Sequence, residues 1–345
     1  MSARASGPVV VLIASPLEPE YVDGIRTVDP RIEVLHDADL LPLPRYVSDH
    51  TGVNTPRTPE QEARFLEMLG RAEVLFDFDR AHVRDLVTVA PRLRWLQATS
   101  AGIGQMVHRV GLDRSTITLT TASGVHARPL ADFCLMAMLM FVKNYVRMER
   151  DKRARGWEPY CGEELTGKTL AILGLGRVGQ EVARHGRRMD MRVIGIRRSE
   201  AAVKDVDVLL RPDDLGAMLR EADFLVLAAP HTPETEGIIG EAELALMKPS
   251  AVLINIGRGA LVDEDALIRA LQERRLAGAA LDVFRAEPPP DDSPLWDMPN
   301  VIISPHSAST VAQENARITE LFCDNLRRYL DGRPLRNVLD TKTLY

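Results

Sequence analysis

The chain has 345 residues, of which 45% are hydrophobic and 27% are charged, and its formal net charge at pH 7 is −6. This length suits two domains better than one. The composition excludes a disordered or collagen-like chain, and it shows no basic excess of the kind that indicates a nucleic-acid partner. We therefore expect a globular protein of two domains that binds no nucleic acid.

The cysteines and the longest apolar stretches also narrow the possibilities. Cys134, Cys161 and Cys323 lie far apart without CxxC or Cys/His ligand spacing, which is typical of incidental thiols in a reducing compartment and predicts no metal site. Val9–Ala14 is too short for the core of a signal peptide, and Pro129–Val142 falls short of the ~20 apolar residues of a membrane span. We expect a cytoplasmic protein without membrane contact.

The first third of the chain alternates short apolar strands with amphipathic helices. The proline-rich stretch Leu41–Pro59 interrupts this alternation and is predicted to be a long loop, a kind of segment that is often functional or mobile. Alternation of strands and helices is typical of a parallel α/β layer with its own core. A helix is expected at Glu60–Leu69, and the expected strands are Val9–Ala14, Ile32–Leu35, Val74–Phe78, Leu93–Gln97 and Ile117–Thr120.

A long helix, Pro129–Arg150, separates this layer from a second series of strands. That series starts near Leu170 and continues with Val193–Ile196, Val208–Leu209, Phe224–Ala228, Val252–Ile256, Ala279–Val283 and Val301–Ile303. A final helix, Ala312–Leu330, suits a chain that returns to pack on the first layer. We predict a discontinuous first domain, residues 1–122 plus 307–345, an inserted second domain, residues 123–306, and an active site in the cleft between them.

The second series opens with a glycine motif, Gly174-Leu-Gly176-Arg-Val-Gly179. A strand precedes it, and a helical segment and another strand follow within ~30 residues, which is the context that makes the motif specific for a dinucleotide. Gly174 makes the tight turn, Gly176 lets the backbone approach the pyrophosphate, and Gly179 lets the helix pack on the strand. The helix N-terminus, at Arg177 and Val178, offers N–H groups and a partial positive charge to the phosphates.

The strand after this helix ends in Arg197-Arg198-Ser199. The first of these residues faces the adenosine ribose, where an Asp or Glu would accept hydrogen bonds from the hydroxyls and repel a 2′-phosphate. Guanidinium groups instead match the geometry of a phosphate, and a serine hydroxyl can donate to it. The sequence therefore predicts a preference for NADP(H), with NAD(H) as the second possible cofactor.

Three charged or titratable residues, Arg258, Glu287 and His306, each follow the carboxyl end of a predicted strand. Open α/β sheets bind their ligands at that edge, so we expect the three to converge. Their chemistry suits the reduction of a 2-oxo acid. His306 titrates near working pH and can deliver a proton, Glu287 can stabilise its imidazolium, and Arg258 can bind and polarise the substrate.

On these residues the chain resembles the D-isomer-specific 2-hydroxyacid dehydrogenase family. The resemblance is dense over roughly residues 165–310, and before residue 120 it rests on the arrangement and on Ser100-Ala-Gly102. It implies two doubly wound domains with parallel sheets, a flavodoxin-like substrate domain and a Rossmann dinucleotide-binding domain. The matching segments are Leu173-Gly-Leu-Gly-Arg-Val-Gly179, Pro230-His-Thr-Pro-Glu-Thr235, Met247-Lys-Pro through Asn255-Ile-Gly-Arg-Gly-Ala-Leu-Val-Asp263, Leu281-Asp-Val-Phe284, Glu287-Pro-Pro289 and Pro305-His306.

The resemblance also implies roles for individual residues. It implies the same catalytic set of Arg, Glu and His, and substrate carboxylate binding by the backbone N–H groups of Ala101 and Gly102. Asp282 would hold the nicotinamide carboxamide, and a homodimer would form through helix 129–150. Arg197 departs from the Asp of many members, which favours NADP(H). Further cofactor contacts are implied at Pro230, Thr235 and Ile256.

The leading interpretation is a homodimeric, NADPH-preferring reductase of glyoxylate, hydroxypyruvate or a similar 2-oxo acid. One alternative is a biosynthetic dehydrogenase of the phosphoglycerate type, although the segment after His306 leaves no room for the regulatory domain that these often carry. Another is a non-enzymatic, dinucleotide-sensing protein like the corepressors of the family. His126 is interpreted as capping or orienting the long helix, and Trp157 and Trp296 as packing residues.

Overall fold

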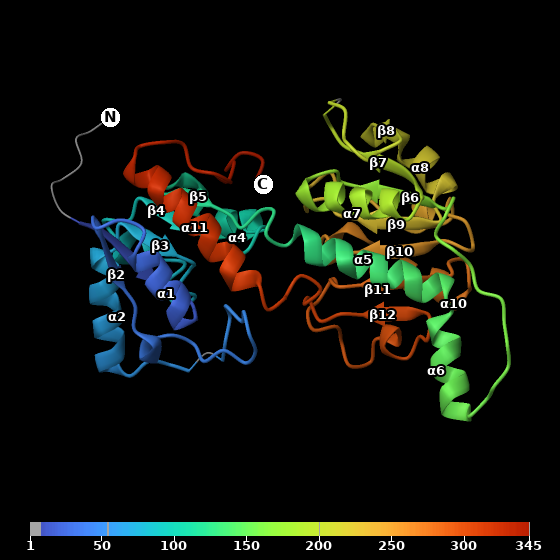
Figure 1. Ribbon diagram of the computed structural model, residues 1–345, viewed down its shortest axis with the longest axis horizontal. Coiled ribbons are helices and arrows are strands. Elements are labelled where there is room, and N and C mark those ends of the chain that lie inside the picture. The colour runs from blue at the N-terminus through green and yellow to red at the C-terminus, as the bar shows by residue number, and fades with distance from the viewer. Residues whose placement is uncertain (1–7, 54, 200, 345) are drawn as a thin grey trace. The chain divides into compact units, whose positions relative to one another are not determined.

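Two parallel sheets organise the chain, as a computed structural model shows for residues 8–53, 55–199 and 201–344 (Figure 1). Contacts divide the chain into unit 1, residues 1–126 with 310–345, and unit 2, residues 127–309. The chain therefore passes between the units twice, after His126 and after Ser309. Both passages lie a few residues after the domain boundaries that we expected.

Unit 1 holds a five-stranded sheet in the order β2-β1-β3-β4-β5, which is the flavodoxin-like order. All of its strand pairs are parallel. Its strands are β1 (Val9–Ile13), β2 (Ile32–Leu35), β3 (Val74–Phe76), β4 (Trp95–Gln97) and β5 (Thr118–Thr120). Its helices are α1 (Pro19–Arg26), α2 (Pro59–Arg71), α3 (Leu86–Val89), α4 (Gly104–Arg109) and α11 (Glu314–Leu330).

Alternate residues of each strand in unit 1 serve two cores, one on each face of the sheet. Ile13 of β1 packs with α1 and α11, whereas its neighbour Leu12 packs with α2 on the opposite face. Phe322 of α11 lies against Trp95 and Phe76, with ring centroids 5.1 Å apart in both pairs. Figure 1 shows α11 beside α1, so the C-terminal segment completes this unit.

Unit 2 holds a seven-stranded parallel sheet in the order β12-β11-β10-β9-β6-β7-β8. The strand order reverses between β6 and β9, which is the switch point where doubly wound sheets bind ligands. One face is covered by α5 and α7, and the other by α8 and α10. The strands are β6 (Thr169–Leu173), β7 (Arg192–Ile196), β8 (Val208–Leu210), β9 (Phe224–Leu227), β10 (Val252–Asn255), β11 (Gly278–Leu281) and β12 (Val301–Ile303), and the helices are α5 (Ala127–Val142), α6 (Tyr145–Ala154), α7 (Arg177–Arg188), α8 (Leu215–Glu221), α9 (Glu241–Leu244) and α10 (Glu264–Gln272).

These sheets confirm the predicted fold class, but the prediction of one continuous helix over Pro129–Arg150 is wrong. The segment forms two helices, α5 and α6, bent by 59°. Helix α5 ends because Asn144 takes a left-handed conformation, with φ of 55°, and because the Val142 carbonyl accepts a hydrogen bond from the Glu163 amide at 2.8 Å. Figure 1 shows α6 reaching beyond the sheet of its unit.

Within the described ranges, no single helix is long and apolar enough to cross a membrane, and one bent pair, α5 with α6, meets those limits only when its helices are counted together. The predicted cytoplasmic location stays a prediction.

Several element ends also differ from the sequence prediction by one or more residues, and two of them have a clear local cause. The long loop ends at Thr58 rather than Pro59, because Pro59 starts α2 and the Thr58 side chain accepts a hydrogen bond from the Gln61 amide. Proline suits the first helical position, and Thr with Gln three residues later forms a capping box. Strand β3 ends at Phe76 rather than Phe78, because Asp77 has a φ of 65°, which takes the chain out of the extended conformation.

Candidate functional site

The three predicted catalytic residues of unit 2 come from neighbouring loops at one edge of its sheet. Arg258 follows β10, Glu287 lies in the loop after β11, and His306 follows β12. These strands are adjacent and parallel. Their carboxyl ends therefore meet at the same edge, and the structure brings the three residues together as the sequence indicates.

His306 and Glu287 form a direct hydrogen bond. Nδ1 of His306 lies 2.7 Å from Oε2 of Glu287, and the side chains are 49% and 40% exposed. An ionised carboxylate only accepts, so Nδ1–H is the donor, and Nε2 remains to give or take a proton. The second carboxylate oxygen of Glu287 accepts from the Phe284 amide at 3.1 Å.

This hydrogen bond shifts the pKa of both partners. The pKa of His306 is raised, mainly by the hydrogen bond to Glu287, while burial works against the rise. Burial alone would raise the pKa of Glu287, but the hydrogen bonds from His306 and the Phe284 amide outweigh it, so the net pKa is lowered. The pair thus favours a protonated imidazole beside an ionised carboxylate.

The backbone of His306 is held in a conformation that is rare outside glycine. Its φ is 53°, and its amide donates to the carbonyls of Asp282 and Ser304, both at 3.0 Å. The buried Asp282 carboxylate organises the same loop, because Oδ1 accepts from the Ser304 hydroxyl at 2.7 Å and from the Ala308 amide at 2.9 Å. Rare backbone conformations of this kind cluster at functional sites. The implied contact of Asp282 with a nicotinamide stays a prediction.

Arg258 stands on a turn that its neighbours shape. Nδ2 of Asn255 donates to the Arg258 carbonyl at 3.0 Å, and Oδ1 of Asn255 accepts from the Gly257 amide at 3.1 Å. A Cβ on Gly259 would lie 1.9 Å from the Phe284 carbonyl oxygen, so the turn and the loop that carries Glu287 pack backbone to backbone. Burial lowers the pKa of Arg258, and the charge of Glu287 opposes that effect.

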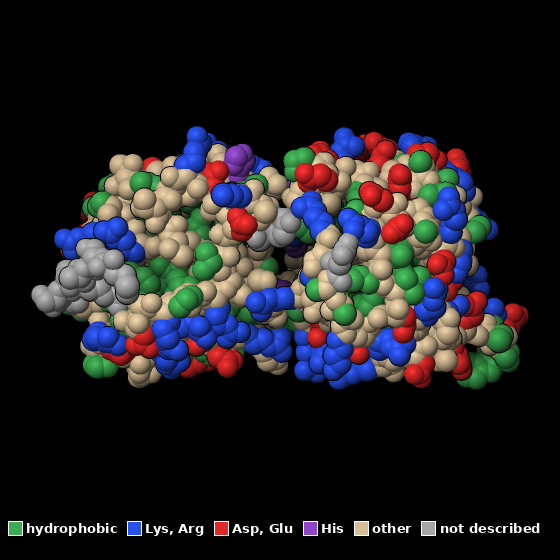
Figure 2. All heavy atoms as spheres, turned by 90° about the horizontal axis from the view of Figure 1, so that it is seen from above, with side chains coloured by type: hydrophobic (Ala, Val, Ile, Leu, Met, Phe, Trp, Pro, Cys, Tyr) green, Lys and Arg blue, Asp and Glu red, His purple; other side chains and the backbone are tan. Residues whose placement is uncertain are grey.

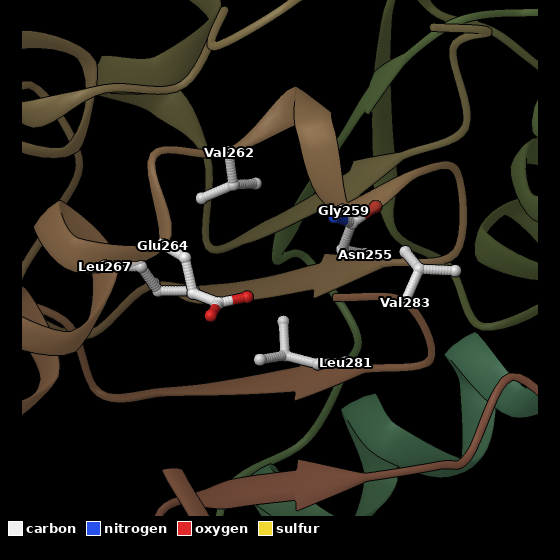
Figure 3. Close-up of a pocket in the computed structure, with 7 residues that line it drawn as sticks. All are labelled: Asn255, Gly259, Val262, Glu264, Leu267, Leu281 and Val283. Carbon is white, nitrogen blue, oxygen red and sulfur yellow. The ribbon is translucent and has the colours of Figure 1, made fainter. Parts of the chain in front are cut away.

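A small cavity lies next to this turn, between the carboxyl ends of β10 and β11 and the start of α10 (Figure 3). Its volume is about 10 Å³, and the polar side chains of Asn255 and Glu264 line it. A cavity of this size holds about one water molecule. It is far too small for a nucleotide, so the candidate site is the surface at the carboxyl edge of the sheet.

The glycine motif fits a dinucleotide, and its three glycines answer to different constraints. A Cβ on Gly174, whose φ is 101°, would lie 2.6 Å from the Ala229 amide nitrogen, and a Cβ on Gly179 would lie 2.0 Å from the Gly174 carbonyl oxygen. Both glycines are therefore required by the fold. A Cβ on Gly176 would have nothing within 4 Å, so no packing requires this glycine, and it leaves room at the N-terminus of α7 for a bound group.

The other predicted cofactor contacts lie on the loops around the switch point. Arg177 and Val178 begin α7 after β6, and Ile256 follows β10. Pro230 and Thr235 belong to a turn after β9, where the Thr235 hydroxyl donates to the Pro230 carbonyl at 2.7 Å. These loops all follow carboxyl ends of β6, β9 and β10, which are neighbours in the sheet.

Arg197, Arg198 and Ser199 follow β7, the neighbour of β6. Arg197 is half-buried, and the other two are exposed. Nη2 of Arg198 lies 3.3 Å from Oε2 of Glu234, an exposed ion pair of a kind that contributes little by itself. On the face of unit 2 that Figure 2 shows, basic and acidic side chains are interspersed. The cationic character of this site is therefore local.

In unit 1, the predicted carboxylate-binding residues Ala101 and Gly102 are exposed, on the loop after β4. A residue that the sequence prediction missed holds this loop. The buried Asp77, after β3, accepts from the Thr99 amide at 3.3 Å and from the Thr99 hydroxyl at 2.9 Å. An acidic residue at the end of a buried strand is the signal that could have revealed it, and the same holds for the polar Asn255 at the end of β10.

The structure also places three other residues that the sequence analysis singled out, one histidine and two tryptophans. The side chain of His126 contacts Glu314 rather than α5, with Nε2 3.1 Å from Oε1. Trp157 is 95% exposed, so the expectation that it packs is wrong for the isolated chain. Trp296 is half-exposed and donates from Nε1 to the Pro290 carbonyl at 3.0 Å.

A family model described as D-isomer specific 2-hydroxyacid dehydrogenase, NAD binding domain, matches residues 135–308. The chain is similar to a glyoxylate reductase of Aeropyrum pernix, with 36% identity over 75% of this chain and 80% of the relative. It is also similar to glyoxylate/hydroxypyruvate reductase B of Pectobacterium carotovorum subsp. carotovorum, with 37% identity over 76% of this chain and 83% of the relative.

A solved structure supports the same relationship. It is that of an NADPH-dependent glyoxylate/hydroxypyruvate reductase from Sinorhizobium meliloti in complex with NADP and sulfate. The two chains superpose with a TM-score of 0.78 at 26% identity, over 97% of this chain and 99% of the other.

The glycine motif allows a sharp test of dinucleotide binding. Gly176→Ala should leave the melting temperature close to that of the wild type, because the added Cβ has open space. It should weaken dinucleotide binding at least about tenfold, because the backbone can no longer approach the pyrophosphate. Calorimetry and a fluorescence titration with NADPH measure the two effects. Gly179→Ala is the matched variant, and it should lower the melting temperature instead, because its Cβ meets the Gly174 carbonyl. Unchanged NADPH affinity in Gly176→Ala would remove the motif from the binding site.

Proposed function

Because this chain belongs to the D-isomer specific 2-hydroxyacid dehydrogenase family, we propose that it reduces glyoxylate, hydroxypyruvate or a similar 2-oxo acid, with NADPH in preference to NADH. The chain is an NAD(P)-dependent oxidoreductase of 2-hydroxy acids. The observation that carries the proposal is the hydrogen bond of 2.7 Å between His306 and Glu287. The Glu287 carboxylate also interacts with the charge of Arg258.

The residues of unit 2 account for the proton and the substrate charge in this reaction. A bound nicotinamide dinucleotide supplies the hydride. As the new C–H bond forms at the 2-oxo carbon, the carbonyl electron pair moves onto oxygen, which takes a proton from Nε2 of His306. Glu287 holds Nδ1 throughout and favours the protonated imidazole beforehand. Arg258 carries a permanent charge and binds the substrate carboxylate.

The dinucleotide is held by the glycine motif and by the loops beside it in this proposal. The backbone of Gly174–Gly179 and the N-terminus of α7 bind the pyrophosphate. Arg197, Arg198 and Ser199 bind the 2′-phosphate, because two guanidinium groups and a hydroxyl provide donors and the first residue after β7 is Arg197 rather than an acid. The NADP complex of the relative from Sinorhizobium meliloti supports this preference.

A substrate panel with both cofactors tests the proposed function. NADPH should be oxidised with at least one short 2-oxo acid, and kcat/KM should be higher with NADPH than with NADH. Arg197→Ala with Arg198→Ala should narrow the ratio of kcat/KM values mainly by raising KM for NADPH, since the lost donors are assigned to the 2′-phosphate, which NADH lacks. A clear preference for NADH in the wild type would overturn the cofactor assignment.

The same panel separates the alternatives. Turnover of 3-phosphoglycerate with NAD⁺ or NADP⁺, without reduction of the short 2-oxo acids, would favour the phosphoglycerate-type dehydrogenase. Binding of NADPH without turnover of any 2-oxo acid would favour the non-enzymatic sensor.

The His306–Glu287 pair makes a specific pH dependence the expected outcome. Reduction needs protonated His306, whose pKa is raised mainly by Glu287. Activity should therefore hold at low pH and fall as pH rises through that raised pKa. Glu287→Gln removes the charge that raises it, so the fall in kcat/KM should move to lower pH. His306→Ala should reduce kcat about 10²- to 10⁴-fold through loss of the proton donor.

The kinetic readout is kcat/KM for reduction against pH, which reports ionisations of the unliganded protein. Glu320→Gln, on the exposed side of α11 in unit 1, serves as the control for loss of a carboxylate elsewhere. A Glu287→Gln profile that superposes on the wild-type profile would reject the role of this carboxylate.

We further propose that two copies of this chain associate through α5 and α6. Large apolar side chains are exposed along these helices and just after them, and no residue of α6 is buried. Clusters of this kind usually mark an interaction surface. A second copy of this chain is the expected partner, because a two-fold symmetric contact would cover the same apolar residues on both chains. The residues are Met136, Leu139, Tyr145, Val146, Met148 and Trp157.

The dimer is tested by sedimentation velocity of the full chain. The wild type should sediment as two chains, and Val146→Glu with Met148→Glu should sediment as one, because two charges would have to be buried in the contact. Val87→Glu, at an exposed apolar residue of α3, is the matched control and should leave the mass unchanged. A monomeric wild type would refute the dimer.

A further inference from the structure

The two passages of the chain between unit 1 and unit 2 are joined by a hydrogen bond inside unit 1. His126 is the last residue before the first passage, and Glu314 follows shortly after Thr310, where the second passage returns. Nε2 of His126 lies 3.1 Å from Oε1 of Glu314. The segments at which the chain can bend between its units are therefore linked by one side-chain contact.

The Glu314 carboxylate is buried and interacts with a second imidazole. Its side chain is 8% exposed, and Nε2 of His50, itself 12% exposed, lies 3.8 Å from the same oxygen, Oε1. Burying a carboxylate is costly unless it is paired. Glu314 is the first residue of α11, where the helix dipole also favours a negative charge. The carboxylate thus lies between two histidines from distant parts of the sequence, hydrogen-bonded to His126 and within ion-pair distance of His50.

His50 belongs to the long loop between Leu41 and Thr58, and the loop has a defined structure around it. The buried Asp49 carboxylate accepts hydrogen bonds from the amides of Thr51 and Gly52 and from the amide and guanidinium of Arg45. The Arg45 contact holds the pKa of Asp49 well below its usual range. The hydrogen bonds to Asp49 therefore hold residues 45–52 in one conformation, so we expect a displacement of His50 to move these residues together.

A second contact attaches the loop to the returning passage. The Ser48 hydroxyl donates to the Val311 carbonyl at 3.4 Å, and Ser48 is buried with a left-handed φ of 66°. The polar base of the loop is thus attached next to Glu314. Its large apolar side chains are exposed, namely Leu43, Tyr46, Val47 and Val53.

We propose that His50, His126 and Glu314 form a clamp that couples the position of the loop 41–58 to the conformation of both passages between the units. Hinges are a few residues at the ends of elements that absorb backbone rotation. Two residues of the clamp lie at such ends, because His126 precedes α5 and Glu314 begins α11. Rotation at His126 or near Val311 displaces the Glu314 carboxylate, and this displaces His50 and the loop. The three lie in unit 1, whereas the residues that we assign to proton transfer lie in unit 2, so we describe the three as positioning residues.

Hydrogen exchange of the full chain, read by mass spectrometry, tests the coupling without any assay of activity. Amides of Asp49 and Val53 are hydrogen-bonded within the loop, so their exchange reports its opening. His126→Ala should speed exchange over residues 43–53 by about 2- to 30-fold, although no hydrogen bond or ion pair among the described residues joins His126 directly to that loop. His126→Gln, whose amide can still donate to Glu314, should restore most of the protection.

The control is His108→Ala, because Nδ1 of His108 lies 2.8 Å from a carboxylate oxygen of Asp113 in the same unit and neither residue belongs to a passage between the units. It should leave residues 43–53 unchanged. The clamp is refuted if loop exchange in His126→Ala equals that of the wild type. It is also refuted if exchange rises equally throughout the sheet of unit 1, since that outcome shows general destabilisation.

A kinetic arm rests on the proposed reduction of 2-oxo acids. In His126→Ala, the fold-increase in KM for the 2-oxo acid should exceed the fold-decrease in kcat by a factor of about ten. The Kd for NADPH should stay unchanged, because the glycine motif lies in unit 2. Equal losses in kcat and in NADPH affinity would contradict a positioning role. If the wild type reduces no 2-oxo acid, the proposed function fails, whereas the exchange experiment still decides on the clamp.

Discussion

The parallel pairing of the seven strands in unit 2 is the constraint on which its candidate site depends. Parallel strands end at one edge, so the loops after β6, β9, β10, β11 and β12 emerge side by side. This places the glycine motif, the Arg258 turn and the Glu287–His306 pair on one edge, although more than a hundred residues separate the first from the last. The pairing between β10 and β11 then sets how closely their loops approach, as the fit of Gly259 against Phe284 shows.

The charges on this edge balance one another in a way that suits proton transfer. Glu287 interacts with both Arg258 and His306, so one carboxylate stabilises two cations. Nε2 of His306 stays available for the proposed proton transfer because Nδ1 is hydrogen-bonded to Glu287, and the His306 backbone is fixed by the Asp282 carbonyl. Proton transfer by a positioned imidazole needs this kind of preorganisation, since orientation and protonation state are set before the substrate arrives.

Unit 1 shows how polar side chains can connect segments that are remote in sequence. Asp77 holds the loop that carries Ala101 and Gly102 through two hydrogen bonds to Thr99. Glu314 brings His50 and His126 to one buried carboxylate. Neither cluster follows a sequence motif, because each depends on side chains that only the folded sheet brings within a few ångströms. Sequence reasoning therefore named Ala101 and Gly102 but missed Asp77, and it interpreted His126 as capping or orienting the long helix.

The sequence by itself determined the two α/β layers and the glycine motif of the dinucleotide-binding domain, and it predicted Arg258, Glu287 and His306 as the candidate catalytic residues. These features are local: alternation of apolar segments marks buried strands, glycine spacing marks a turn before a helix, and chemistry follows from residue type at the end of a strand. Only the tertiary structure decided where α5 ends, how Glu287 bonds His306 and which histidines surround Glu314. Those outcomes depend on long-range packing: the Val142 carbonyl, for example, accepts its hydrogen bond from the amide of Glu163, which lies far along the chain but close in space.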